Sequence, residues 1–367
     1  MWTLTKDKSW EQLKKFSWIN DMHGVPQSPV YHAEGDVAIH TQMVLAALEN
    51  LEEFNALNEL DKEIIWTAAL MHDIEKRSTT FTDEKGNIVS PGHAKKGAVT
   101  TRQILYRDFA TPFKIREQVA GLVRYHGLPL WLFEKPNPVQ ALLKASLEVN
   151  ICWLAMLAKA DVLGRICADA DELLYKIDLF KELAIEYDCW DKPKNFASDL
   201  SKFQYFRKDD RHPDFESFDD TKSEVIMMSG IAGSGKDYYI LKNYPSLPVV
   251  SLDDMRRKAK IGYGDAKGNG RIIQAAKEQA KEYLRKGIPF IWNATNITLQ
   301  MREQLIELFE PYKPRIKIVY VETSYSKLTA QNKGRDFTIP QHAIEKMIDK
   351  LEVPKLWEAM EVVYIAH

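Results

Sequence analysis

The stretch "EVIMMSGIAGSGKD", residues 224–237, restricts the fold of this chain more than any other feature. It begins as an apolar run typical of a buried strand. Gly230, Gly235 and Lys236 then satisfy the spacing G-x-x-x-x-G-K just before a helical segment. In this order, backbone N–H groups and a lysine ammonium can face phosphate groups. The sequence therefore predicts a phosphate-binding loop at the end of a buried strand.

Further apolar runs follow this loop and alternate with helical stretches such as "GRIIQAAKEQAKEYLRKG". The apolar runs, including the one before the loop, are "EVIMMSG", "PVVSL", "PFIWNAT", "RIKIVYVET" and "VVYIAH". Short apolar runs of this kind are typical of parallel strands buried on both faces. We therefore predict a doubly wound α/β domain with a parallel sheet.

The chain before this domain has a different pattern. Up to about residue 199 apolar residues recur at helical spacing, as in "DKEIIWTAALMHDIEK". The charged segment "FRKDDRHPDFESFDDTKS" lacks periodicity and marks the best candidate for a domain boundary. We predict a multidomain chain, with an all-α helical bundle over residues 1–215 and the α/β domain over residues 216–367.

The composition is that of a globular protein, with 367 residues, 45% hydrophobic residues and 28% charged residues. The formal net charge of -2 provides no global basic field, so any nucleic-acid binding must come from local patches such as 256–260. The first residues are charged and no apolar run reaches membrane-spanning length, so we expect a cytoplasmic protein without a membrane partner.

Asp237 is the unusual residue of the phosphate-binding loop, because it stands where a Ser or Thr hydroxyl normally contacts Mg²⁺. Its carboxylate could serve the same Mg²⁺, or it could simply favour the helix N-terminus. The sequence leaves both interpretations open. The expected nucleotide phosphate-binding residues are Gly230, Gly233, Ser234, Gly235, Lys236 and Asp237.

The segment "SLDDMR" closes the second apolar run, which we expect beside the strand that carries the loop. There Asp253 could accept the proton of an attacking hydroxyl, and Arg256 could hold an acceptor phosphate. Alternatively, Asp253 only caps the following helix. Asn293 and Asn296 end the third run, at the sheet edge where ligands bind. "NKGRDFTIP" suggests a lid whose Arg335 covers the donor phosphates.

Together, "GIAGSGKD", "DDMR", "NATN" and "GRDFTIP" resemble the P-loop polynucleotide kinases, which phosphorylate 5′-OH ends of RNA or DNA. The resemblance implies that Asp253 is the general base, that Arg256 binds the acceptor and that Lys236 and Arg335 act on the donor phosphates. It also implies ATP or another NTP as donor, with Mg²⁺. Asp237 departs from the Ser or Thr of the family.

The first half contains residue types that bind metals, in helix-type contexts: His40, His72, Asp73, His93, His126 and Asp161. A helical bundle could gather them around one pocket. Imidazoles with two carboxylates suit Mn, Fe, Co or Ni, and six ligands suffice for two ions or for one ion and an assisting histidine. A pair of such ions can support phosphoester hydrolysis.

This order, H…HD…H…H…D, resembles the HD-domain phosphohydrolases. Locally it is most similar to the HD domain of bacterial tRNA nucleotidyltransferases, whose activity includes cleavage of 2′,3′-cyclic phosphate and removal of 2′-phosphate. The remaining histidines, His32 among them, are expected to be structural or surface residues.

An HD domain before a polynucleotide kinase resembles the bacterial HD-Pnk family of RNA end-healing enzymes. That resemblance implies RNA or DNA ends as substrates, removal of 2′,3′-cyclic, 2′- or 3′-phosphate, and an RNA ligase as possible partner. Two alternatives stay open: a nucleoside or nucleotide kinase joined to a nucleotidase, and a nucleotide-sensing regulator.

Overall fold

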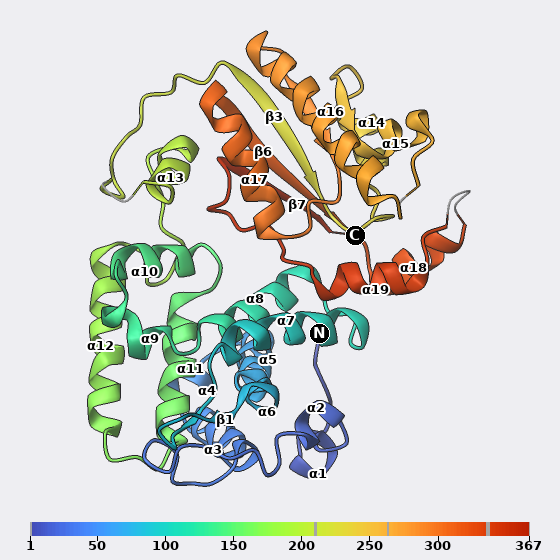
Figure 1. Cartoon of the computed structure of the whole chain (residues 1–367). Helices are drawn as coiled ribbons and strands as arrows, with labels where there is room; N and C mark the ends of the chain where they lie inside the picture. The colour runs from blue at the N-terminus through green and yellow to red at the C-terminus, as the bar shows by residue number, and fades with distance from the viewer. Residues whose placement is uncertain (1, 209–210, 263, 335–337, 367) are drawn as a thin grey trace. The chain divides into compact units, whose positions relative to one another are not determined.

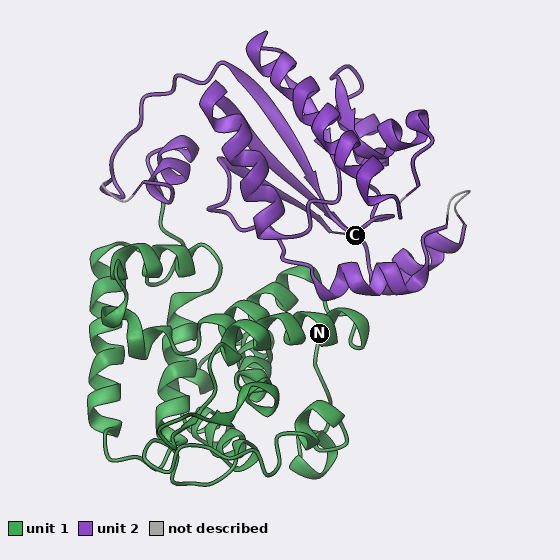
Figure 2. Cartoon of the chain, in the orientation of Figure 1, with its two compact units in different colours: residues 1–195 green, residues 196–367 purple. Residues whose placement is uncertain are grey.

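The computed structural model describes residues 2–208, 211–262, 264–334 and 338–366. The chain divides into two compact units, residues 1–195 and 196–367 (Figure 2). This division falls earlier than the boundary expected between residues 215 and 216. The reason is that Leu200 and Phe203 of α13 (Asp199–Tyr205) belong to the core of the second unit.

The first unit is a helical bundle with one short antiparallel hairpin, β1 (Phe81–Thr82) and β2 (Ile88–Val89), which the sequence did not predict (Figure 1). No single described helix is long and apolar enough to cross a membrane. Only a pair, α10 (Pro138–Ser146) and α11 (Ile151–Leu163), has the length and composition together, and it is bent by 110°. The helices are α1 (Trp10–Leu13), α2 (Ser17–Asn20), α3 (Val37–Glu49), α4 (Glu52–Asn55), α5 (Glu59–Met71), α6 (Lys76–Thr79), α7 (His93–Arg107), α8 (Phe113–Tyr125), α9 (Leu128–Trp131), η1 (Leu132–Glu134), α10 (Pro138–Ser146), α11 (Ile151–Leu163) and α12 (Ala170–Glu186).

A close approach between α3 and α11 organises the core of this bundle. Gly164 ends α11 against Val44 of α3, and a Cβ atom at Gly164 would lie only 2.7 Å from the Val44 backbone N. Residues three and four apart share one helix face, so Asp161 and His40 lie one turn before this contact on the facing sides of the two helices. The glycine thus brings two polar side chains together between α3 and α11.

The described residues of the second unit form a parallel five-stranded sheet in the order β4-β5-β3-β6-β7. Each apolar run expected as a strand is one. However, β5 lies between β4 and β3, so the expectation that the "PVVSL" strand adjoins the loop-bearing strand was wrong. The elements are β3 (Ser223–Ser229), α14 (Lys236–Asn243), β4 (Val249–Ser251), α15 (Leu252–Ala259), α16 (Ala266–Arg285), β5 (Phe290–Asn293), α17 (Leu299–Phe309), η2 (Glu310–Tyr312), β6 (Pro314–Glu322), α18 (Tyr325–Lys333), α19 (Gln341–Asp349) and β7 (Glu361–Ala366).

Both faces of this sheet are covered, as the uninterrupted apolar runs require. Alternate residues of β3 enter two separate cores: Val225 and Met227 pack with α13, α16 and α17, whereas Ile226 and Met228 pack with α14. The loop that follows β3 therefore emerges at the carboxyl edge of the sheet, the edge where open α/β sheets bind ligands.

Candidate functional site

The six expected metal-binding residues of the first unit lie close together and come from several helices. His40 belongs to α3 and Asp161 to α11, both in buried helix interiors. His72 and Asp73 follow α5 directly, because this buried helix ends at Met71. The two others also lie at helix ends, where the backbone can turn a side chain inward: His93 begins α7 and His126 follows α8.

Asp73 lies at the centre of this group. Its Oδ2 is 3.2 Å from His72 Nε2 and 3.8 Å from His40 Nε2, and its Oδ1 is 3.4 Å from His93 Nε2 and 3.9 Å from His126 Nε2. Asp161 Oδ1 lies 3.1 Å from His40 Nε2. The carboxylate of Asp73 therefore lies within 4 Å of four imidazoles, so it would be one of the groups that hold a divalent cation here.

The imidazoles all point the same nitrogen into the centre, because their other nitrogen is already occupied. The Nδ1 atoms of His72, His93 and His126 donate to the carbonyls of Ala69, Ser90 and Val123, at 2.7, 2.7 and 2.9 Å. His40 Nδ1 lies 2.8 Å from a carboxylate oxygen of Glu34. Such contacts fix the tautomer and leave Nε2 as the ligand atom.

The pKa shifts of His126 and Asp73 suit metal binding. Burial lowers the pKa of His126 to about 3, with the nearby His72 adding to the effect, so that this imidazole is neutral at pH 7. Burial alone would raise the pKa of Asp73, but Lys76 and His72 lower it well below its usual value. Neutral imidazoles and ionised carboxylates are the forms that bind divalent cations.

The six residues fall into two sets that could each hold a divalent cation. His40, His72 and Asp161 form one set, and Asp73, His93 and His126 form another; in each set the ligand atoms lie within 4.8 Å of one another. Among the described residues, the buried Nε2 atoms of His40 and His72 make no hydrogen bond. His93 Nε2 and His126 Nε2 face each other at 3.3 Å, an arrangement that a shared cation would stabilise.

Two positively charged side chains, those of Lys76 and Arg165, contact the carboxylates of this centre. Lys76 Nζ lies 2.7 Å from Asp73 Oδ2 and also donates to Gln27 Oε1 at 2.7 Å. Arg165 holds Asp161 with two bonds, from Nε to Oδ1 at 3.0 Å and from Nη2 to Oδ2 at 2.5 Å. Both cations are in place to orient the carboxylates and to attract a phosphate group.

The sequence did not reveal the part played by His32 and Glu34. Glu34 Oε1 lies 2.9 Å from His32 Nδ1, and Oε2 accepts from the backbone N of Ile166 at 2.9 Å. The His32 and His40 rings meet edge to face at 4.7 Å. His32 is therefore beside the metal-binding group and not an isolated surface residue. The only sequence signal was "EGD", which precedes His40 closely.

The glycine-rich loop of the second unit has the conformation that its motif requires. Gly230, Gly233 and Gly235 have φ values of 140°, 87° and 101°, a region that disfavours residues with a Cβ. A Cβ at Gly230 would also lie 2.3 Å from the carbonyl oxygen of Val321. Ser234 is buried within the loop. The backbone thus turns tightly enough to direct its N–H groups to one point.

Lys236 and Asp237 begin α14 just after the loop. Lys236 Nζ donates to the carbonyls of Gly230 and Ile231, both at 2.9 Å, which places its ammonium over the loop. Asp237 Oδ1 accepts from Asn293 Nδ2 at 2.7 Å. The end of β5 therefore holds the unusual carboxylate, a contact that the sequence did not predict.

Asn296, the second asparagine expected at this edge, has a structural role. It is buried with φ 43°, and its Nδ2 donates to the carbonyl of Met228 at 2.7 Å. Ser229 Oγ donates in turn to the Asn296 carbonyl at 3.0 Å. Asn296 therefore fixes the backbone at the end of β3, while Asn293 presents a side chain to the loop.

Asp253, the expected general base, and Arg256, the expected acceptor-binding residue, lie together on α15. Asp253 Oδ1 is 2.6 Å from Arg256 Nη1, and Arg256 Nε donates to Asn269 Oδ1 of α16 at 2.6 Å. Ser251 provides the N-cap of α15, with its Oγ accepting from Asp254 N at 3.2 Å. The N-cap of α15 is therefore Ser251, and Asp253 does not cap this helix.

The expected lid follows α18. Asn332 of α18 is joined to the backbone of Ile339 by two hydrogen bonds: its Nδ2 donates to the Ile339 carbonyl at 2.7 Å, and its Oδ1 accepts from Ile339 N at 3.0 Å. Arg335, predicted to act on the donor phosphates, lies outside the described residues.

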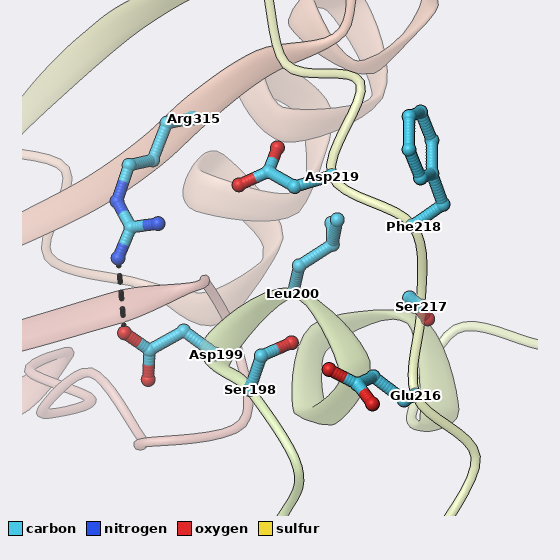
Figure 3. A pocket seen from close by; sticks show the side chains of 8 residues that line it. All are labelled: Ser198, Asp199, Leu200, Glu216, Ser217, Phe218, Asp219 and Arg315. Atoms are coloured by element: carbon cyan, nitrogen blue, oxygen red, sulfur yellow. Dashed lines mark hydrogen bonds and ion pairs between the residues drawn. The ribbon is translucent and has the colours of Figure 1, made fainter.

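A pocket of ≈ 590 Å³ in the second unit lies away from this chemistry (Figure 3). An ion pair of 3.0 Å between Asp199 and Arg315 crosses one side of it. Arg315 pairs in register with Glu224 at the start of β3, so the pocket is at the amino edge of the sheet. The phosphate-binding loop is at the opposite edge.

Comparisons with known proteins agree with this division. The HD domain family matches residues 37–175, and a family described as an AAA domain matches residues 225–354. The Multifunctional CCA protein of Haemophilus influenzae (strain PittGG) is 37% identical over 94 residues, which are 25% of this chain and 21% of that protein. Its counterpart in Legionella pneumophila (strain Paris) is 32% identical over 108 residues, 29% of this chain and 23% of that protein. The chain thus spans less than a quarter of these curated relatives.

The solved structures found by comparison include two proteins named as kinases. A sugar kinase from a Janibacter species has 13% identity and a TM-score of 0.31, over 39% of this chain and 85% of that chain. A gluconokinase from Sinorhizobium meliloti has 17% identity and a TM-score of 0.30, over 40% of this chain and 83% of that chain. From the family matches and the two sites, the chain consists of a helical HD domain followed by a P-loop kinase-like domain with a parallel five-stranded sheet.

Proposed function

We propose that the chain heals broken polynucleotide ends in the cytoplasm, with one activity in each unit. The kinase-like domain transfers the γ-phosphate of ATP or another NTP to a 5′-OH end of RNA or DNA. The HD domain removes a 2′,3′-cyclic phosphate, or a 2′- or 3′-phosphate, from a 3′ end. The products are the 5′-phosphate and 3′-OH that an RNA ligase joins, so a ligase is the expected partner.

The observation that carries this proposal is the pairing of Asp253 with Arg256 at the ligand-binding edge of the sheet. A guanidinium beside the base can hold an anionic group of the acceptor close to the attacking hydroxyl. A guanidinium next to the base suits an acceptor whose hydroxyl is close to a phosphodiester. A 5′-terminal nucleotide with a 3′-phosphodiester has this chemistry.

The transfer would proceed in one displacement. Asp253 takes the proton of the 5′-hydroxyl as its oxygen attacks the γ-phosphorus, and the bond from that phosphorus to the β,γ-bridging oxygen breaks to release the nucleoside diphosphate. Acceptor phosphate competes with Asp253 for Arg256, which frees the carboxylate to act as base. Lys236 exchanges its loop carbonyl partners for the donor phosphates.

In the HD domain, two divalent ions would activate water and neutralise the phosphate under attack. Lys76 and Arg165 would orient the two carboxylates and add positive charge for the substrate. The match to proteins named Multifunctional CCA protein, and the resemblance to HD domains that cleave 2′,3′-cyclic phosphate, support an RNA end as substrate.

The test is an RNA with a 5′-OH and a 2′,3′-cyclic phosphate, incubated with the protein, NTP, Mg²⁺ and one of a panel of transition metals. Analysis of both ends should show a new 5′-phosphate and a 3′ end without phosphate. Phosphorylation of a free nucleoside but not of the oligonucleotide would overturn the kinase assignment. Nucleotide binding without turnover at either end would favour a regulator.

A further inference from the structure

Arg302, on the buried face of α17, forms an ion pair inside the second unit. Its side chain is 0% exposed, so the guanidinium is removed from water. Nε and Nη2 donate to Oε2 and Oε1 of Glu358, at 2.6 and 3.0 Å. The Glu358 side chain is buried as well. The two side chains therefore form a bidentate ion pair that no solvent reaches.

A buried ion pair is a costly way to fill a core, because both charges lose their hydration. Apolar side chains of similar volume often stabilise a core as well or better. The buried face of α17 already contributes Leu305, Ile306 and Phe309 to such a core. A guanidinium offers, in addition, five N–H donors in a rigid fork, which can hold several acceptors at once. The contacts of the third nitrogen, Nη1, therefore indicate what this arginine does.

Nη1 of Arg302 joins two backbone carbonyls from different parts of the chain. It donates to the carbonyl of Asn296 at 3.0 Å and to the carbonyl of Glu352 at 2.8 Å. Glu352 lies between α19 and β7, and its backbone N donates to the carbonyl of Ile297 at 2.8 Å. The turn between β5 and α17 is therefore held at two successive carbonyls, one of them by Arg302.

This turn is in direct contact with the phosphate-binding loop. Gly230, the first glycine of the loop, donates from its backbone N to the carbonyl of Thr295 at 2.8 Å. The carbonyl of Asn296 also accepts from Ser229 Oγ, so one donor from β3 and one from α17 hold the same oxygen. Asn296 has φ 43°, an uncommon conformation that persists where surrounding contacts hold it.

We propose that Arg302 is a positioning residue of the phosphate-binding loop. It holds the Asn296 carbonyl, and with it the turn in which Thr295 accepts from the Gly230 N–H. Glu358 neutralises the guanidinium and fixes its orientation with two bonds. Because Arg302 is buried, it acts through Asn296 and not by contact with the NTP. This inference rests on the proposed kinase function, in which the loop binds the NTP donor.

The test compares three variants of the full chain: Arg302→Gln, Arg302→Lys and Leu305→Ala. Arg302→Gln removes the charge together with the Nη1 donor. Arg302→Lys keeps a positive charge opposite Glu358 but lacks Nη1, so it removes the contact with Asn296 at a smaller cost to the core. Leu305→Ala is the matched control, because it destabilises the same helix through a cavity and removes no hydrogen bond.

Two measurements follow the loop itself. Equilibrium binding in the presence of Mg²⁺ is measured for ATP and for inorganic tripolyphosphate, which has no base or sugar and uses phosphate contacts alone. Hydrogen–deuterium exchange of the peptide that contains Gly230 follows the bond from its N–H to Thr295. Both are measured at a temperature at which thermal unfolding shows the variants to be folded.

Both Arg302 variants should bind ATP and tripolyphosphate more weakly by the same factor, about tenfold, as expected for the loss of one hydrogen bond from a charged group. Exchange at Gly230 should be faster in both. Leu305→Ala should match the unchanged protein in binding and exchange. Unchanged binding by Arg302→Lys, or an equal loss in Leu305→Ala, would overturn the proposal. If Arg302→Gln does not fold, Arg302→Lys decides by the same criteria.

Phosphorylation of a 5′-OH oligonucleotide, measured in parallel, separates this proposal from the kinase assignment. If the unchanged protein binds ATP but phosphorylates no 5′-OH end, the proposed kinase function fails. Weaker binding of ATP and tripolyphosphate by Arg302→Lys would still support the positioning role. If the oligonucleotide is phosphorylated and all the variants bind ATP equally, the positioning role is refuted and the kinase assignment stands.

Discussion

Replacement of Glu34 by Ala should weaken one of the two metal-binding sets and leave the other intact. Glu34 is buried and is the carboxylate partner of His40 Nδ1, at 2.8 Å. The other three imidazoles rest on backbone carbonyls that the substitution does not remove. The effect should therefore be confined to the set of His40, His72 and Asp161.

Loss of a partner that fixes a ligating histidine typically reduces metal affinity 10–100-fold, or about 1.4–2.7 kcal/mol. We expect this decrease for one ion per chain. The assay is a chelator titration of the Co²⁺-loaded protein, with bound metal followed by its absorption bands. The unchanged protein should lose its ions only at a high chelator concentration. Glu34→Ala should release one ion at a chelator concentration 10–100-fold lower.

His32→Ala is the matched control, because it removes the second histidine on Glu34 and leaves the Glu34–His40 contact in place. It should retain both ions with unchanged affinity. If Glu34→Ala also holds both ions as tightly as the unchanged protein, Glu34 does not orient His40. If His32→Ala loses as much affinity, the whole segment, and not the carboxylate, is responsible. Unchanged 5′ phosphorylation in both variants would confirm that the second unit is intact.

Three further predictions concern the two sites. His72→Ala should abolish phosphate release at the 3′ end of a test RNA and spare 5′ phosphorylation, since the units have separate cores; equal loss of both in a folded variant would contradict this. Asp253→Ala should lower 5′ phosphorylation by about 10²–10⁴ with nearly unchanged NTP affinity, whereas a collapse of NTP affinity would make Asp253 a metal ligand. Asp237→Ala should need much more Mg²⁺ for half-maximal activity than Asp237→Ser, and identical Mg²⁺ curves would return Asp237 to a helix-start role.

The local elements of the fold could be predicted because their signals are local. Short apolar runs mark strands buried on both faces, and the spacing of Gly230, Gly235 and Lys236 marks the loop between β3 and α14. Strand order could not be predicted in this way. It depends on where each crossover returns to the sheet, which is why the position of β5 between β4 and β3 was missed.

In the metal-binding group, too, local features could be predicted from the sequence, whereas contacts with residues distant in sequence could not. The six expected ligand residues, which lie close together in the structure, could be selected by residue type and helix context. Glu34 could not, because its role depends on His40 and on a backbone N–H of Ile166, which is 132 residues later. His32 lies in a turn without helical spacing, so nothing in its own neighbourhood marks it as a neighbour of the metal-binding group.

Asp237 makes a contact with a residue distant in sequence, and this contact bears on the two interpretations that the sequence leaves open. A carboxylate in a phosphate-binding loop repels the donor unless its charge is offset. The α14 N-terminus offsets part of it, as would be true of any acidic residue in a first helical turn. Asn293, however, reaches from the end of β5 to hold Oδ1 at 2.7 Å, which fixes the orientation of the carboxylate relative to the loop. A carboxylate held in this way is oriented as sharing Mg²⁺ with the donor phosphates would require, and the Mg²⁺ dependence of Asp237→Ala and Asp237→Ser tests that interpretation against a role at the helix start.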